Sequence, residues 1–217
     1  MIYMQKQFYS EKASESLLIL RKIAKETNFV VIGGWAVHAY IGLQRSLDVD
    51  IALDYNALDY FSKYQIQKYS GININYVLID GITVDLFIPE FTDKDLPFPV
   101  ADILLNYVIV DGIKIVKREW LLILKLWSYF SSDETKINKD IIDVVSLLFY
   151  GNIDLRQVKK LITTYKLGRR RTVDVILEYL DKGVTLKEFI VEKNEMYLTF
   201  ALEAKKKIKR VLNINLE

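Results

Sequence analysis

Two aspartates, Asp48 and Asp50, stand one residue apart in a segment that is otherwise largely apolar. On an extended strand, residues two apart point to the same face and lie about 6–7 Å from each other along the backbone. Two negative charges at that spacing repel each other unless a cation lies between them. Because the neighbouring Val49 and Ile51 favour a buried strand, the acidic pair indicates a functional site.

A third aspartate, Asp85, lies in the middle of the apolar segment 82–88. Aspartate is disfavoured in such a strand by propensity and by burial, although an edge strand with one solvated aspartate is the plain alternative. If the two acidic strands are neighbours, Asp48, Asp50 and Asp85 can together hold two divalent cations. Such a pair of cations activates an attacking hydroxyl and stabilises a leaving pyrophosphate. Asp85 would then also take the proton from the acceptor hydroxyl.

Gly33 and Gly34 end a short apolar strand and directly precede a predicted helix. A turn of this kind presents backbone N–H groups at the positive end of the helix. Because glycine has no side chain, a triphosphate can approach the backbone closely there. A Gly-Gly pair alone is not specific to a nucleotide site. Here, however, the pair stands close to Asp48 in the sequence, separated from it only by residues 35–47. The combination predicts a nucleotide site.

The segment 31–53 resembles the signature of the DNA polymerase β-like nucleotidyltransferase superfamily. That signature is a hydrophobic residue, Gly, then Gly or Ser, a spacer, and Asp-hydrophobic-Asp-hydrophobic, with a third aspartate on a later strand. The strings Gly-Gly-Trp-Ala-Val and Gly-Leu-Gln-Arg-Ser-Leu-Asp-Val-Asp are similar to the branch that contains abortive-infection toxins and small stand-alone nucleotidyltransferases. In that branch Arg-x-Thr-x-Asp is usual, and Ser46 replaces the Thr with another hydroxyl.

The resemblance covers residues 29–90 and, more loosely, extends to about residue 150. Lys125 and the run from Lys139 to Asp143 resemble helical elements of the branch. The family often has an Arg before its Lys-Asp pair, whereas Thr135 and Lys136 stand near that place here. The last third of the chain has no counterpart in this comparison.

The resemblance implies a Mg²⁺-dependent or Mn²⁺-dependent nucleotidyltransferase that moves a nucleoside monophosphate from an NTP to a hydroxyl. The acceptor can be RNA such as tRNA, a protein, or a small molecule such as an aminoglycoside, and a toxin–antitoxin or defence role would bring an antitoxin-like partner. The alternative is a catalytically silent nucleotide-binding or interaction protein on the same fold. The residues implied are Asp48, Asp50 and Asp85 for catalysis and metal binding, and Gly33, Gly34, Ser46, Lys139, Lys125 and Arg45 for nucleotide binding.

Several of these side chains have a structural alternative. Arg45 can pair locally before the acidic strand instead of binding triphosphate, and Ser46 can cap a turn instead of meeting a phosphate. His38, near Trp35 on a short predicted helix, is expected to be packed and not catalytic.

In the helical half, too, each candidate side chain has a functional and a structural interpretation. Lys139 lies at the start of a predicted helix, where a cation is unfavourable unless an anion such as a nucleotide phosphate approaches. Asp140 and Asp143, in a first helical turn, would instead complement the helix dipole. The basic clusters 169–171 and 205–210 are expected at or just after helix C-termini, and the alternative is a track for RNA phosphates.

The pattern of apolar residues predicts an α+β fold. A small mixed sheet flanked by helices is expected in residues 1–118, and a C-terminal helical domain in residues 119–217. Two Asp-Gly pairs predict hairpin turns between apolar runs. The expected strands are 29–32, 47–53, 73–79, 82–88, 107–110 and 113–116, and the expected helices are 12–26, 35–41, 58–69, 119–131, 138–150, 155–167, 172–182 and 186–212.

Composition limits the classes of function. The 217 residues contain no Cys and one His, so a metal site must use oxygen ligands, and a disulfide framework is excluded. A net charge of +2 gives no global field for nucleic acid. Because 51% of the residues are apolar and 27% are charged, the chain is globular. We find no signal peptide and no apolar run of bilayer length, so we expect a cytoplasmic protein without membrane contact.

Overall fold

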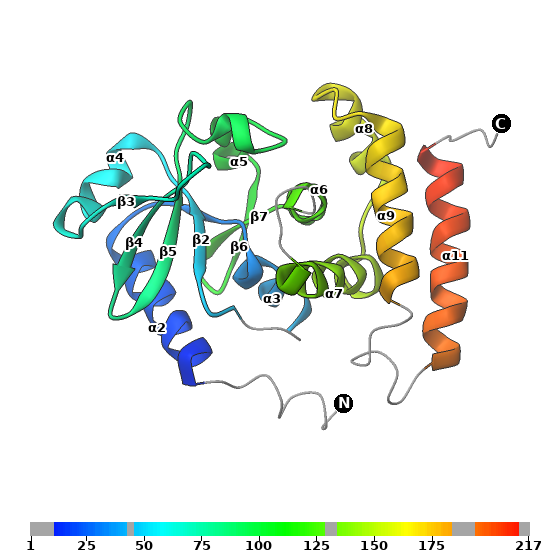
Figure 1. Cartoon of the computed structure of the whole chain (residues 1–217), viewed down its shortest axis with the longest axis horizontal. Coiled ribbons are helices and arrows are strands. Elements are labelled where there is room, and N and C mark those ends of the chain that lie inside the picture. The colour runs from blue at the N-terminus through cyan, green and yellow to red at the C-terminus, as the bar shows by residue number, and fades with distance from the viewer. Residues whose placement is uncertain (1–10, 43–45, 129–133, 184–193, 213–217) are drawn as a thin grey trace. The chain divides into compact units, whose positions relative to one another are not determined.

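The computed structural model describes residues 11–42, 46–128, 134–183 and 194–212. The chain divides into two compact units, Met1–Lys117 and Arg118–Glu217. The described part of the first unit combines a sheet with helices, and that of the second is helical (Figure 1). The predicted α+β class, with a mixed sheet flanked by helices, is confirmed.

The strands described in the first unit form one mixed sheet in the order β3-β4-β5-β2-β1-β7-β6 (Figure 1). The pairs β2–β5 and β1–β7 are parallel, and the other pairs are antiparallel. The strands are β1 (Val30–Val31), β2 (Val49–Ala52), β3 (Gln67–Lys68), β4 (Asn75–Ile79), β5 (Ile82–Phe87), β6 (Tyr107–Val110) and β7 (Ile113–Val116).

Helices pack on this sheet and close its apolar side. Helix α2 (Glu11–Glu26) contacts β2 and β5, and α3 (Gly34–Ile41) contacts β2 and β7. Along β5 the residues Ile82, Val84 and Leu86 are buried, whereas Thr83 and Asp85 are only half-buried. This alternation is typical of a strand with a core face and a second, more accessible face, and Asp85 lies on the second.

Both predicted hairpins are confirmed, together with their turns. Asp80 and Gly81 have φ angles of 50° and 79°, and Asp111 and Gly112 have φ angles of 49° and 79°. Positive φ at both central residues is the requirement of a type I′ turn, which matches the twist of the paired strands.

The predicted helix 58–69 is wrong in its second half. A short helix α4 (Tyr55–Leu58) is capped by Asp54, which accepts the Ala57 N–H at 2.9 Å, and continues as the 3₁₀ helix η1 (Asp59–Lys63). The chain then becomes extended, and β3 pairs antiparallel with β4. Sheet pairing therefore overrides the local helical pattern. Sequence analysis also missed the 3₁₀ helix η2 (Asp93–Asp95) and the helix α5 (Val100–Leu105).

In the second unit, α6 packs against α7, α8 and α9, and α11 packs against α8 and α9. Tyr179 is fully buried and belongs to the core of this unit, and the half-buried Tyr165 packs edge-on against Trp120 with ring centroids 5.5 Å apart. Among the described residues, no helix is both long enough and apolar enough to cross a membrane. The helices are α6 (Arg118–Ser128), α7 (Glu134–Tyr150), α8 (Leu155–Thr164), α9 (Arg169–Gly183) and α11 (Asn194–Leu212).

Candidate active site

The sheet brings Asp50 and Asp85 together. They are register partners on the adjacent parallel strands β2 and β5, so their side chains stand next to each other on one face. Tyr76 of β4 is the antiparallel partner of Asp85, and Gln67 of β3 is the partner of Tyr76. A row of polar and aromatic side chains therefore crosses four strands, with the two carboxylates at one end.

Gly33 lies against the Asp50 carboxylate. A Cβ atom at position 33 would overlap the carboxylate and Cγ of Asp50, and it would lie 2.6 Å from the Asp50 Cβ. Gly33 is also the N-cap of α3, where its carbonyl accepts the N–H groups of Ala36 and Val37 at 3.0 and 3.2 Å. The sequence interpretation assigned this space to a triphosphate. In the structure, the lack of a side chain at position 33 leaves room for Asp50. Gly34, also buried, is the first residue of α3.

Gly33→Ala is expected to lower the free energy of unfolding by about 1–3 kcal/mol, because the added methyl group overpacks against Asp50. Urea unfolding followed by circular dichroism measures this cost. In an Asp50→Ala background the carboxylate is gone, and the cost should shrink. An equal cost in both backgrounds would contradict the overlap as its cause.

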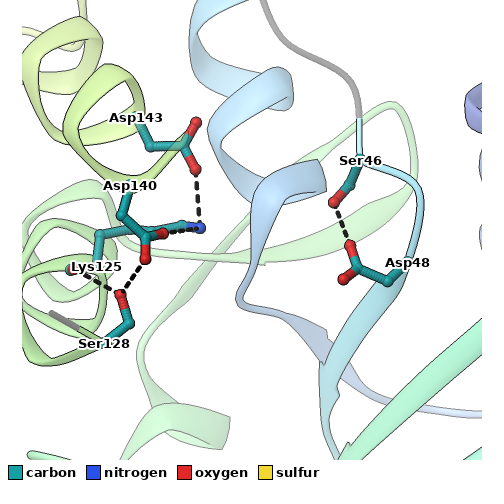
Figure 2. Close-up of polar contacts among 6 residues, drawn as sticks. All are labelled: Ser46, Asp48, Lys125, Ser128, Asp140 and Asp143. Atoms are coloured by element: carbon teal, nitrogen blue, oxygen red, sulfur yellow. Dashed lines mark hydrogen bonds and ion pairs between the residues drawn. The ribbon is translucent and has the colours of Figure 1, made fainter. Parts of the chain in front are cut away.

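A chain of hydrogen bonds holds the segment that leads into Asp48. The indole N–H of Trp35 donates to Ser16 Oγ at 3.0 Å, and Ser16 Oγ donates to the Ser46 carbonyl at 2.7 Å. Ser46 is fully buried, and its hydroxyl donates to Asp48 Oδ1 at 2.5 Å (Figure 2). These contacts support a positioning role for Ser46. Sequence analysis did not identify Ser16, because a serine within an amphipathic helix gives no signal of a distant partner.

Tyr69 follows β3 and lies above the acidic row. Its hydroxyl donates to Asp85 Oδ1 at 2.9 Å, and its ring stacks on Tyr76 with centroids 4.4 Å apart. Burial raises the pKa of Tyr69, and the charges of Asp85, then Asp48 and Asp50, raise it further. All three carboxylates therefore lie within electrostatic reach of one phenol. Sequence analysis missed Tyr69 because it placed this residue at the end of a helix.

The donor chemistry of this face suits a hard cation such as Mg²⁺, because carboxylate oxygens are its preferred protein ligands. Within the described ranges, however, no group of three or more His, Cys, Asp or Glu side chains is arranged to hold a metal ion. Binding of Mg²⁺ by Asp48, Asp50 and Asp85 is therefore a prediction.

Lys125 lies in the helical unit, between two carboxylates. Its Nζ is 2.8 Å from Asp143 Oδ2 and 3.4 Å from Asp140 Oδ1, and the Ser128 hydroxyl donates to Asp140 Oδ2 at 2.9 Å (Figure 2). Asp143 is fully buried, and burial raises its pKa, whereas the charge of Lys125, then that of Lys139, opposes this shift. These contacts support a structural role for Lys125 and Asp143.

The structure corrects the position of three of these residues along their helix. Helix α7 begins at Glu134, four residues before the predicted start, so Lys139, Asp140 and Asp143 lie beyond its first turn. The predicted interaction with the helix dipole therefore does not apply to them, since it falls off within the first turn. Lys139 is half-buried, and its nucleotide contact is a prediction.

The sequence also singled out Arg45 and His38. Arg45 falls outside the described residues. His38 packs edge-on against Trp35, with ring centroids 5.2 Å apart, which fits the expected packed histidine.

The basic cluster 169–171 follows the C-terminus of α8, as predicted, but it also forms the first turn of α9, which begins three residues before its predicted start at residue 172. The cluster 205–210 lies in the last part of α11, as predicted, and its Lys205 forms an ion pair with Asp181.

No family model matches the sequence, and neither does any curated protein. Among solved structures, the chain is similar to TM1012 of Thermotoga maritima, a protein provisionally assigned as a nucleotidyltransferase. The two are 20% identical with a TM-score of 0.40, over 61% of this chain and 91% of that chain. At this identity and TM-score the similarity carries no functional argument, so a functional proposal has to rest on the residues of the site.

Proposed function

We propose that the chain is a nucleotidyltransferase that moves a nucleoside monophosphate from an NTP to an acceptor hydroxyl and releases pyrophosphate. One observation carries the proposal: Asp50 and Asp85 are register partners on neighbouring parallel strands, and Asp48 precedes Asp50 by two residues. The charges of all three raise the pKa of the Tyr69 hydroxyl, which supports their belonging to one site.

Each residue has a role in this proposal. Asp48, Asp50 and Asp85 would bind Mg²⁺, which when bound supplies positive charge to the triphosphate and to the leaving pyrophosphate. Asp85 accepts the proton of the acceptor hydroxyl, because it already accepts a hydrogen bond from a hydroxyl group at 2.9 Å. Ser46 holds Asp48, and Gly33 leaves room for Asp50.

The remaining assignments concern nucleotide contacts and partners. Gly34, Arg45, Lys125 and Lys139 stay predicted nucleotide contacts. RNA such as tRNA, a protein and a cationic small molecule are the three acceptor classes, and an antitoxin-like partner in the cytoplasm belongs to the toxin–antitoxin version of the proposal. A neighbouring gene for such a partner would favour that version.

A second candidate is a nucleotide-binding protein without turnover. One observation favours it: Asp48 and Asp85 each accept a hydrogen bond from a hydroxyl group of the chain. In this alternative, the chain binds NTP and Mg²⁺ as a sensor or as part of a complex.

Incubation with labelled NTPs, Mg²⁺ and total RNA tests the proposal, with the Asp48→Ala/Asp50→Ala variant as comparison. We expect label transfer by the wild type and loss of transfer in the variant. Equal labelling by both proteins would refute the catalytic assignment. Calorimetry separates the alternatives, since NTP binding without turnover would favour a sensor and absence of binding would favour an interaction protein.

A further inference from the structure

The hydroxyl group of Tyr69 lies directly beside the carboxylate of Asp85. Its oxygen is 2.9 Å from Asp85 Oδ1, the atom that accepts a proton in the proposed reaction. The backbone N–H of Tyr69 donates to the Ile74 carbonyl at 3.1 Å, and the ring is stacked on Tyr76 with an interplanar angle of 28°. Backbone and ring contacts therefore hold the phenol in place above the carboxylates.

Two other hydroxyl groups near this row differ from Tyr69. Ser46 also donates to a carboxylate, that of Asp48, but it is fully buried and cannot meet a nucleotide without a rearrangement. Tyr76 donates to Gln67 Oε1 at 2.6 Å and not to an acid. Tyr69 is half-buried, so it combines contact with the proposed proton acceptor and access from solvent.

We propose that Tyr69 is itself an acceptor, so that the chain transfers a nucleoside monophosphate from an NTP to its own Tyr69 hydroxyl. This inference rests on the proposed function. A bond forms between the Tyr69 oxygen and the α-phosphorus, and the bond from that phosphorus to the oxygen of the leaving pyrophosphate breaks. The phenolic proton passes to Asp85, and no group is oxidised or reduced.

The modification would also regulate the site. A nucleotide attached to Tyr69 removes the hydrogen bond to Asp85 and places a phosphodiester beside the acidic row. Because like charges repel there, we expect each chain to be modified once and then to transfer more slowly to other acceptors.

The experiment uses the full chain with Mg²⁺ and each NTP in turn, without any added acceptor. Intact mass spectrometry should show the gain of one nucleoside monophosphate, and peptide mapping should assign it to Tyr69. Tyr69→Phe should abolish the gain. The matched variant Tyr76→Phe should retain it, because it keeps the stacked ring and loses only the hydroxyl that contacts Gln67.

The outcomes separate the two proposals. Transfer to RNA or protein without modification of Tyr69 would overturn self-modification and leave the proposed function standing. Modification that persists in Tyr69→Phe would overturn it as well, because the label would then lie elsewhere. Absence of transfer to any acceptor, together with absence of NTP binding, would overturn both. Circular dichroism of Tyr69→Phe excludes misfolding as the cause of a loss.

Discussion

Asp85→Asn is expected to lower the initial rate of pyrophosphate release by about 10²–10⁴-fold, the usual contribution of a general base. Asparagine has nearly the shape of aspartate, and its side-chain oxygen can still accept the Tyr69 hydrogen bond. It cannot take a proton from an acceptor hydroxyl, and it lacks the charge that attracts Mg²⁺. The variant therefore tests the chemistry of Asp85 separately from its packing.

Asp80→Asn is the matched control for this variant. Asp80 lies in the turn of the same hairpin, is exposed, and has a positive φ that asparagine adopts readily. We expect an unchanged rate for the control and unchanged circular dichroism for both variants. A folded Asp85→Asn variant with the wild-type rate would remove Asp85 from the proposed mechanism.

Lys125→Met is expected to lower the free energy of unfolding by about 3–5 kcal/mol, the cost of leaving a buried charge without its partner. Lys125 is 12% exposed, and its closest partner, Asp143, is completely buried. Methionine fills a similar volume, so the loss reports the missing charge more than a cavity. Chemical denaturation followed by circular dichroism measures the change.

The pH dependence of the stability loss in Lys125→Met tests whether Asp143 causes it. Because burial raises the pKa of Asp143, the folded state binds a proton there more readily than the unfolded state does, so the contribution of protonation to stability is lost as pH rises through the folded pKa. Without Lys125 that pKa rises further, and the deficit of the variant should shrink as pH falls toward the unfolded value of 3.8. A deficit that does not change with pH would contradict this origin.

Lys182→Met is the matched lysine control. Lys182 pairs with Glu178 at 2.6 Å, but the two side chains are 42% and 39% exposed. A solvated pair four residues apart on a helix contributes about 0.3–0.5 kcal/mol, so the control should unfold nearly like the wild type.

The parts of the fold that sequence predicted well are those governed by local chemistry. Asp80-Gly81 and Asp111-Gly112 fix their turns because few residue pairs adopt two positive φ angles. Alternation along β5 likewise separates Asp85 from its buried neighbours.

The errors arise where a distant partner decides the structure. Pairing with β4 makes Gln67–Lys68 a strand, although the preceding residues predict a helix. Helix α9 begins at Arg169. The sequence predicts its start three residues later, because a run of arginines is typical of the end of a helix and not of its beginning.

The candidate site was predictable in part for the same reason. Aspartates in apolar strands are visible in a sequence because they conflict with burial. Tyr69 gives no such signal in the sequence, because tyrosine is common in both helices and strands. Its contact with Asp85 depends on the pairing of β3 with β4, which brings it to the acidic face.

The register of β5 determines on which face of the sheet Asp85 lies. Ile82, Val84 and Leu86 are buried because Asp85 points the other way, so a slip of one residue would exchange the two faces. Exposing three such aliphatic side chains would cost roughly 5–9 kcal/mol, at about 1.5–3 kcal/mol each. That cost approaches the whole stability of a typical domain. The hydrophobic core therefore selects the register that places Asp85 on the accessible face, because a chain in the shifted register would lose most of its stability.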